Sequence, residues 1–267
     1  MERCQGPLLG RAKQKMGVES KAGHWGEETW DSKCVKGAPG SIEGIAESGE
    51  DVRDGLFRTL FRDYRRYRAA GARNFLSVVA LTQGFWATAV FRLCHWMIAH
   101  VRWRGVRVLV KIPCLLLEKF IEVVTGISIP AQCNIGPGLY VGHFGGIFID
   151  ARSRLGENCN VAQGVTIGEG GRGELHGMPV IGDRAHVGAN AVILGKITIG
   201  DDAVIGPGAV VMSSVPARGV AMGNPARVVG LSGSFEFVNY DNMEKDPARS
   251  LALQQAAEAS SGNQGES

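Results

Sequence analysis

Aliphatic residues recur at every sixth position from Ile181 onward, and this spacing dominates the hydrophobic pattern of the chain. The six positions hold Ile181, Val187, Ile193, Ile199, Ile205 and Val211. An α-helix, with 3.6 residues per turn, would rotate such a set away from any single face. A chain that turns a corner every six residues keeps the set on one side, where β-branched side chains of stacked coils form a continuous core. The pattern therefore predicts a parallel β-helix of hexapeptide repeats.

The same spacing extends upstream in two shifted registers. The first register contains Ile129, Ile135 and Val141, and the second, offset by two residues, contains Ile149, Leu155, Val161 and Ile167. This offset predicts two extra residues near Gly146. A longer interruption, from Glu169 to Val180, is polar and rich in glycine, so we expect a loop that projects from one corner. The whole solenoid is predicted over residues 127–230.

Helical spacing replaces the six-residue pattern in the preceding region. Leu56, Leu60 and Tyr64 are spaced by four, and the strongly apolar stretch that follows is interrupted by Gly105 and Pro113. We expect a mainly β protein with an α-helical N-terminal domain at residues 51–126. Residues 1–50 and 231–267 are polar and lack a sustained period, so disorder is expected in both, apart from one short helix near residues 247–257.

The most apolar part of the helical region is too short for a membrane span. Residues 75–91 carry no charge, but a transmembrane helix needs about 20 such residues, and Arg92 ends the stretch. Residues 96–111 place Arg and Lys beside Trp96 and Trp103. This composition suits either the solvated face of a helical domain or a peripheral membrane contact. Both interpretations remain open from the sequence.

Charge and cysteine usage narrow the class of protein. A net charge of +3 comes without any run of Lys and Arg, so no nucleic-acid binding is expected. The six cysteines show neither CxxC spacing nor a metal-ligand pattern, and no metal is expected. Cys94, Cys114 and Cys159 fall at apolar positions, as free buried thiols do, which fits a reducing environment. We therefore expect a cytoplasmic protein, with peripheral membrane contact as an option.

Motifs in both regions together resemble the serine O-acetyltransferases, a family of hexapeptide-repeat acetyltransferases. They read Thr82-Gln-Gly-Phe-Trp-Ala, Phe91-Arg-Leu-Cys-His-Trp96, Thr125-Gly-Ile-Ser-Ile129, Ile135-Gly-Pro-Gly-Leu-Tyr-Val-Gly-His143, Gln163-Gly-Val-Thr-Ile-Gly168 and Gly223-Asn-Pro-Ala-Arg-Val-Val-Gly230. The resemblance covers roughly residues 55–230. It implies a left-handed β-helix, acetyl-CoA as co-substrate without a metal, and a homotrimer or dimer of trimers with active sites between neighbouring solenoids.

The resemblance also implies the site residues. His143 matches the catalytic histidine, and His176 matches a second active-site histidine. Imidazole titrates near neutral pH, so it can take the proton of an attacking hydroxyl and later protonate the thiolate leaving group. The positions that match the family's cofactor site are small corner residues and one cation near the nucleotide phosphates. They are Gly168, Gly188, Ala189, Gly206, Pro207 and Arg227.

The acceptor of the acetyl group does not follow directly from the resemblance, because the acidic residues that the family uses for the serine ammonium are absent. Ala69–Gly71 occupy the position of an Arg-Asp-Pro motif, and Ser128 and Gly142 stand where aspartates are expected. An ammonium held without a carboxylate is poorly compensated. This departure resembles enzymes of polysaccharide biosynthesis, so the expected acceptor is a sugar unit of a surface polysaccharide. L-serine, on the route to cysteine, is the alternative, and a non-catalytic scaffold is the second alternative.

Overall fold

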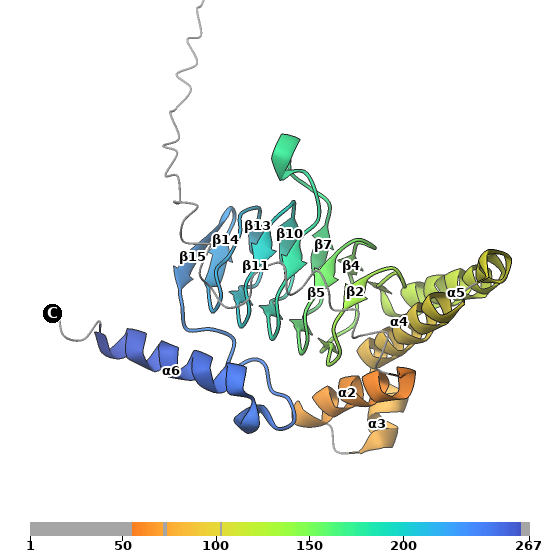
Figure 1. Ribbon diagram of the computed structural model, residues 1–267, viewed down its shortest axis with the longest axis horizontal. Helices are drawn as coiled ribbons and strands as arrows, with labels where there is room; N and C mark the ends of the chain where they lie inside the picture. The colour runs from red at the N-terminus through yellow and green to blue at the C-terminus, as the bar shows by residue number, and fades with distance from the viewer. Residues whose placement is uncertain (1–54, 72–73, 102, 263–267) are drawn as a thin grey trace, which may run out of the picture. The chain divides into compact units, whose positions relative to one another are not determined.

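The computed structural model describes residues 55–71, 74–101 and 103–262. The expected disorder of residues 1–50 lies outside these ranges. Within them, four helices precede the repeats (Figure 1): α2 (Leu56–Ala69), α3 (Phe75–Leu81), α4 (Gln83–His100) and α5 (Arg104–Thr125). The helices pack on the first coil of the solenoid, where α2 and α4 contact β3 and α5 contacts β1.

Pro113 does not interrupt the helical region, contrary to the expectation from the sequence, because it lies inside α5. Proline removes one backbone hydrogen bond, but residue 113 is exposed, so water can solvate the carbonyl that loses its partner. The helix ends instead at Gly126, whose φ of 68° is the left-handed conformation that glycine adopts at helix C-termini. The first strand begins at the next residue.

Short strands follow one another along the solenoid, and from β1 to β12 each group of three forms one coil. They are β1 (Ile127–Ser128), β2 (Asn134–Ile135), β3 (Tyr140–Val141), β4 (Ile147–Ile149), β5 (Arg154–Leu155), β6 (Asn160–Val161), β7 (Thr166–Gly168), β8 (Val180–Ile181), β9 (His186–Val187), β10 (Val192–Leu194), β11 (Thr198–Ile199), β12 (Val204–Ile205), β13 (Val210–Val211), β14 (Val220–Gly223) and β15 (Ala226–Gly230). Strands three apart pair in parallel up to β13 and build sheet A (β1-β4-β7-β10-β13), sheet B (β2-β5-β8-β11) and most of sheet C (β3-β6-β9-β12), to which β14 adds in parallel on β12. Among the strands of the described residues, only β15 adds in antiparallel orientation, on β14. This topology confirms the predicted parallel β-helix.

The inward positions form the core of the solenoid. Every position that the six-residue spacing predicted to point inward is buried, with exposed fractions between 0% and 7%. The thiols of Cys133 and Cys159 lie in the same cluster, while Cys94 and Cys114 pack between α4 and α5. All four of these cysteines are free and buried, which confirms the interpretation of Cys94, Cys114 and Cys159.

The separation of paired strands gives the length of the first insertion. Phe148 pairs with Thr166, a separation of 18 residues, which is the length of three hexads. Ile127 pairs with Ile147, a separation of 20. The two extra residues lie in the turn between β3 and β4, as the sequence predicted near Gly146.

The second insertion is the predicted projecting loop. Arg154 pairs with Val180, a separation of 26, so this coil is eight residues longer than three hexads. The extra residues leave the solenoid after β7 and return before β8 (Figure 1), and they include the short 3-10 helix η1 (Gly173–Leu175). A bridge between Gly170 and Gly177 closes the base of the loop, with N···O distances of 3.0 and 3.1 Å.

A buried ion pair joins the helices to the solenoid. Asp63 on α2 and Arg92 on α4 are 0% and 3% exposed, and Arg92 Nε lies 2.9 Å from Asp63 Oδ2. The carboxylate also accepts hydrogen bonds of 2.7 and 2.9 Å from two backbone N–H groups in the turn 136–139. The guanidinium donates to the carbonyls of Ile135 and Gly136 at 2.5 and 2.7 Å. Such additional partners are what makes burial of a charge pair tolerable.

The segment after the solenoid is folded through residue 262, which corrects the disorder expected over residues 231–267. It contains η2 (Met243–Lys245) and α6 (Pro247–Gly262). Val238 is fully buried, and the ring of Phe237 stacks on that of His186 with centroids 4.8 Å apart. A few apolar side chains in an otherwise polar segment thus cover sheet C, and mean composition does not reveal them.

We predict that Asp63→Asn lowers the free energy of unfolding by about 3–5 kcal/mol, because the buried guanidinium of Arg92 loses the carboxylate that compensates its charge. Urea unfolding followed by circular dichroism measures the loss. The control is Glu157→Gln, which breaks the more exposed pair with Arg62 (2.5 Å) and should cost less than about 1 kcal/mol. Equal losses in the two variants would contradict the special role of the buried pair.

Candidate active site

The turns between sheets stack into edges that run along the solenoid. We call the turn from sheet C to sheet A the CA edge; its turns are residues 142–146, 162–165, 188–191 and 206–209. Backbone hydrogen bonds link successive turns along this edge, from Gly164 N to Gly145 O (3.0 Å), Asn190 N to Gln163 O (2.9 Å) and Gly208 N to Ala189 O (2.8 Å). The turn from sheet A to sheet B is the AB edge, from which the projecting loop leaves.

His143 lies on the CA edge, in the turn that carries two extra residues. Gly145 and Gly146 in this turn have φ of 98° and 68°, a conformation that glycine adopts without steric cost. Gly145 N donates to Thr125 O at 3.0 Å, and a Cβ on Gly126 would lie only 3.0 Å from Gly145 Cα. The turn is therefore held closely against the end of α5, while the imidazole of His143 is exposed.

Four of the predicted cofactor residues share the CA edge with His143. Gly188 and Ala189 lie two coils beyond it, and Gly206 and Pro207 lie three coils beyond it. With neighbouring strands about 4.8 Å apart, this places them roughly 10–15 Å along the edge from the turn of His143. A Cβ at Gly188 would lie 2.8 Å from Ile205 O, so the stack requires glycine there.

Arg227 continues the same edge at its far end. It lies on β15, opposite Met222 on β14. A Cβ at Gly206 would lie 2.9 Å from Met222 Cγ, so the β14–β15 hairpin directly follows the turn of Gly206 and Pro207. The guanidinium of Arg227 is exposed and donates to Ala226 O at 3.0 Å. The CA edge thus carries an accessible imidazole at one end, small residues along its length and a cation at the other end.

Gly168 and His176 are not on this edge. Gly168 ends β7, opposite Leu194 in sheet A, and His176 follows η1 in the projecting loop, so both belong to the AB edge. The strand from Gly146 to Asp150 separates the two edges by roughly 13 Å. The structure therefore brings His143 together with five predicted cofactor residues but leaves His176 and Gly168 on a different edge of the same chain.

A cluster of charges surrounds His176, and the sequence analysis missed most of it. Glu169 Oε1 lies 3.5 Å from His176 Nε2, and Glu169 Oε2 accepts from Arg152 Nη2 at 2.6 Å. Arg152 Nε lies 3.8 Å from Asp150 Oδ1. The length of the coil could have revealed this cluster. Ile149 pairs with Ile167, and the same separation of 18 residues places Glu169 next to the turn that contains Asp150.

The other carboxylates near the repeats are engaged elsewhere. Glu118 Oε1 accepts a hydrogen bond from Ala131 N at 3.0 Å, and burial raises the pKa of this carboxyl group. Glu122 forms an ion pair of 2.7 Å with Lys119. Glu169 is the carboxylate that contacts His176, and Asp150 is connected to it through Arg152.

The outer face of sheet A lies between the two edges and carries no charge. Its outward residues are Ser128, Phe148, Thr166, Val192 and Val210, which stand opposite one another along the sheet. Phe148 is exposed. Sheet C differs, because α2 and the C-terminal segment cover it; Asn160 Nδ2, for example, donates to Phe237 O at 2.8 Å. Sheet A is therefore the face that leaves both edges accessible to another molecule.

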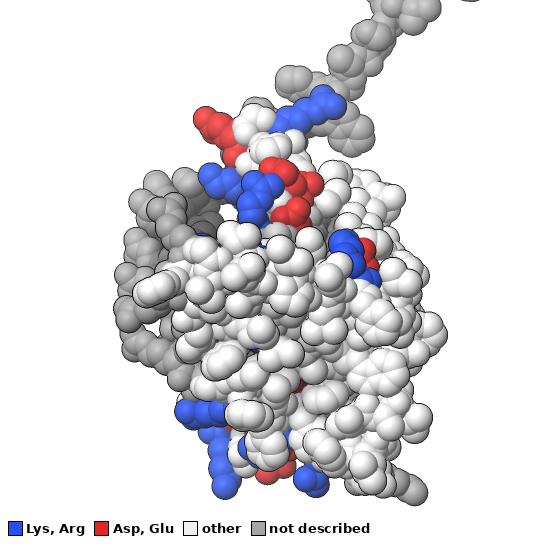
Figure 2. Space-filling view, turned by 90° about the vertical axis from the view of Figure 1, so that its right-hand side faces the viewer, with Lys and Arg blue, Asp and Glu red and all other residues white. Residues whose placement is uncertain are grey.

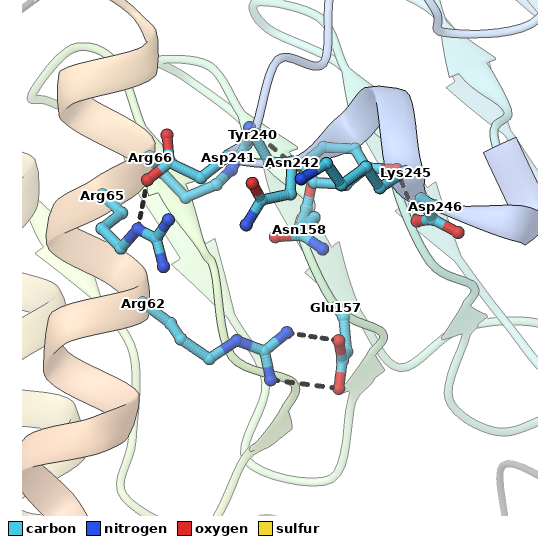
Figure 3. A pocket seen from close by; sticks show the side chains of 10 residues that line it. All are labelled: Arg62, Arg65, Arg66, Glu157, Asn158, Tyr240, Asp241, Asn242, Lys245 and Asp246. Atoms are coloured by element: carbon cyan, nitrogen blue, oxygen red, sulfur yellow. Dashed lines mark hydrogen bonds and ion pairs between the residues drawn. The ribbon is translucent and has the colours of Figure 1, made fainter.

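A separate pocket lies between α2 and the C-terminal segment (Figure 3). Its charged residues largely pair with one another, as Arg62 does with Glu157 and Arg65 with Asp241. Glu157 belongs to the turn from sheet B to sheet C, so the pocket is on neither of the two edges that carry the histidines. We interpret it as a set of polar contacts that fixes the C-terminal segment to α2.

Comparison with known proteins identifies close similarities. Residues 178–212 match the family model for bacterial transferase hexapeptide (six repeats). A serine acetyltransferase of Synechococcus elongatus is 32% identical over 203 residues, which are 74% of this chain and 79% of that protein. A solved serine acetyltransferase in complex with CoA aligns with a TM-score of 0.56 and 30% identity, over 71% of this chain and 76% of that one. The Neisseria gonorrhoeae serine acetyltransferase in complex with serine aligns with a TM-score of 0.55 and 29% identity, over 70% and 72%.

Proposed function

The chain belongs to the serine acetyltransferase family, and on that premise we propose that it transfers the acetyl group of acetyl-CoA to the hydroxyl of L-serine. The observation that carries the proposal is the CA edge, which combines an accessible His143, a column of small residues and the exposed Arg227. The three proteins compared above are serine acetyltransferases, and one of them holds serine. They favour the serine acceptor over the sugar that the missing aspartates suggested.

His143 acts as the base in this proposal. Its neutral imidazole takes the proton of the serine hydroxyl as the oxygen attacks the thioester carbonyl of acetyl-CoA. The tetrahedral intermediate then releases the thiolate of CoA, and the imidazolium returns the proton to that sulfur. The products are O-acetylserine and CoA, and His143 regains its starting protonation state. The exposed position of the ring in its turn suits access of both substrates.

The CA edge would bind acetyl-CoA. Gly188, Ala189, Gly206 and Pro207 leave a narrow path along which the thin pantetheine arm can lie, because larger side chains would fill it. Arg227 at the far end would pair with phosphate oxygens through charge-assisted hydrogen bonds. Gly168 lies on the AB edge, so it would contact the cofactor only from a neighbouring copy.

The AB edge would supply the counter-charge for the serine ammonium. Asp150 and Glu169 carry two negative charges against one positive charge on Arg152, so the cluster keeps an excess carboxylate at neutral pH. Such a partner is what the ammonium needs. These carboxylates come from positions other than Ala69–Gly71, Ser128 and Gly142, where the sequence comparison looked for them.

In a homotrimer, the CA edge of one chain would meet the AB edge of the next chain. His143 and His176 lie on opposite sides of sheet A in one chain, so a site that contains both needs a second copy. The uncharged outer face of sheet A, with Phe148 exposed, provides a surface on which copies can pack. Closed cyclic symmetry would then form three equivalent sites, each from the CA edge of one chain and the AB edge of the next.

We predict that the protein acetylates L-serine with a kcat/KM of at least about 10⁴ M⁻¹s⁻¹, the lower end of ordinary enzyme efficiency. Release of free CoA thiol measures the rate. N-acetyl-L-serine, which lacks the ammonium, is the matched control and should react far more slowly. Faster turnover of nucleotide- or lipid-linked sugars would restore the sugar acceptor, and the absence of thiol release with every acceptor would favour the scaffold.

We predict that His143→Ala lowers kcat by roughly two to four orders of magnitude, the usual effect of losing a general base. Acetyl-CoA binding, measured by calorimetry, should change little, because the small residues of the CA edge remain. His100→Ala is the control, since His100 is exposed on α4 and its ring contacts that of Trp96, with centroids 4.5 Å apart. A His143→Ala enzyme with more than about a third of wild-type kcat would show that another residue is the base.

Mixed oligomers test whether the two edges meet between chains. We predict that His143→Ala and His176→Ala are each nearly inactive alone. In a cyclic trimer that contains both variants, one site of the three keeps both histidines, so doubly tagged mixed trimers should regain about one third of wild-type activity. Mixed trimers no more active than the separate variants would place both histidines in sites within one chain, and a fully active His176→Ala would remove His176 from the site.

A further inference from the structure

The hydroxyl group of Tyr140 lies beside the turn of His143 and has no role in the mechanism described so far. Tyr140 is on β3, three residues before His143, and its side chain is half-buried. A Cβ on Gly142, the residue that directly precedes His143, would lie 3.2 Å from Tyr140 Cε1 and 3.5 Å from Tyr140 Oη. The edge of the phenol ring therefore lies over Gly142, at the start of the turn that carries His143.

Neighbouring side chains hold the ring of Tyr140 in this position. The ring of Tyr67 on α2 packs against it with centroids 4.9 Å apart, and the guanidinium carbon of Arg66 lies 5.9 Å from its centroid. Both neighbours are buried and bonded to the first coil, since Tyr67 Oη donates to Val141 O at 3.3 Å and Arg66 Nε donates to Gly138 O at 3.0 Å. The hydroxyl is thus positioned before any ligand binds, which lowers the cost of binding.

The hydroxyl of Tyr140 has no hydrogen-bond partner within the part of the chain that the structure describes. The hydroxyl of Tyr67 is bonded to the backbone of Val141, and that of Tyr240 donates to Asp246 at 2.6 Å. Burial raises the pKa of the Tyr140 hydroxyl more than the nearby guanidinium of Arg66 lowers it, so the group is neutral at neutral pH. A neutral phenol both donates and accepts, and an unused one beside a reactive turn is explained by a ligand atom that pairs with it.

The coil that carries His143 has no carboxylate of its own. No Asp or Glu occurs between Val123 and Ile149 in the sequence. Figure 2 views the molecule from the end where the helices meet this coil, and the Asp and Glu visible there lie mainly toward the top, where Figure 1 shows the projecting loop. Although this end carries few charges, no single helix within residues 55–71, 74–101 and 103–262 is both long and apolar enough to span a bilayer. A partner that this coil offers to an acceptor is therefore a neutral group.

The position of this hydroxyl favours the ammonium of L-serine as its partner. Gly142 is one of the residues that stand where an aspartate was expected, and Tyr140 Oη lies beside the point where such a side chain would begin. An ammonium has three N–H donors, and burying one without an acceptor is costly. The carboxylates of the AB edge compensate its charge, and a lone pair of Tyr140 Oη accepts a further N–H. Gly142 and His143 have Cα atoms about 3.8 Å apart, so one small acceptor can reach both the phenol and the imidazole.

We propose that Tyr140 is an acceptor-binding residue, whose hydroxyl oxygen accepts a hydrogen bond from the ammonium of L-serine while His143 of the same chain takes the proton of the serine hydroxyl. This inference rests on the proposed function, because it requires serine as the acceptor. It adds a neutral contact on the CA edge to the charged contacts of the AB edge, so the ammonium is held between the two chains that form the site.

Tyr140→Phe in the full chain tests the proposal, because it removes the hydroxyl and keeps the ring that packs against Tyr67. We expect the KM for L-serine to rise about tenfold or more, the effect of losing a hydrogen bond to a charged group, with the KM for acetyl-CoA unchanged. Calorimetry with L-serine in the presence of CoA should show the same loss of affinity without any turnover. The matched control is Tyr64→Phe on α2, whose ring packs on that of Phe75, and it should bind L-serine like the wild type.

A second acceptor separates this contact from a structural role. 3-Hydroxypropionate is serine without the ammonium, so Tyr140→Phe should turn it over at high concentration at the same rate as the wild type. An equal loss with both acceptors would show that Tyr140 supports the fold or His143 instead, and would overturn the proposal. An unchanged affinity of Tyr140→Phe for L-serine would overturn the proposal as well, while the proposed function would stand. A wild-type protein that neither binds nor acetylates L-serine would refute the proposed function itself, and this inference with it.

Discussion

The stack of inward aliphatic side chains determines where the other parts of this protein lie. Each coil must present the same inward positions to the coil before it, since the side chains fill a continuous interior with exposed fractions below 8%. Only the turns between sheets are free to vary in length and conformation. The predicted chemistry is accordingly found at turns: His143 in one, the small cofactor residues in the turns beyond it, and His176 in a loop that leaves another.

A second constraint is the buried contact between Asp63 and Arg92. Both side chains hydrogen-bond to the first coil of the solenoid, and α2 and α4 are fixed by it. The end of α5 is then held by Gly126 and Thr125 against the turn of His143. The helical region thus positions the turn of His143 directly, and the same packing leaves the outer side of α5 exposed.

The six-residue period made the solenoid predictable from the sequence. The predictions were wrong or incomplete in the C-terminal segment and around His176, where no such period guides them. The inward set is confirmed because a six-residue spacing over several coils has few alternative explanations. The shifted register located the first insertion, and the polar, glycine-rich interruption located the second. The tail was missed because Val238 and Tyr240 are buried one at a time in a polar segment. The carboxylates beside His176 were missed because a family motif directed attention to Ser128 and Gly142, although Asp150 and Glu169 come together only through the coil geometry.

The coils of this chain differ in length by more than their shared interior suggests. Paired strands are separated by 18 residues at Phe148, but by 20 at Ile127, 26 at Arg154 and 16 at Val204. Each difference is confined to a turn, so the inward residues of later coils keep their places. Insertions and deletions at these turns leave the pairing of the inward residues intact. The length of a turn at the edge of the solenoid is therefore set independently of the residues that form its interior.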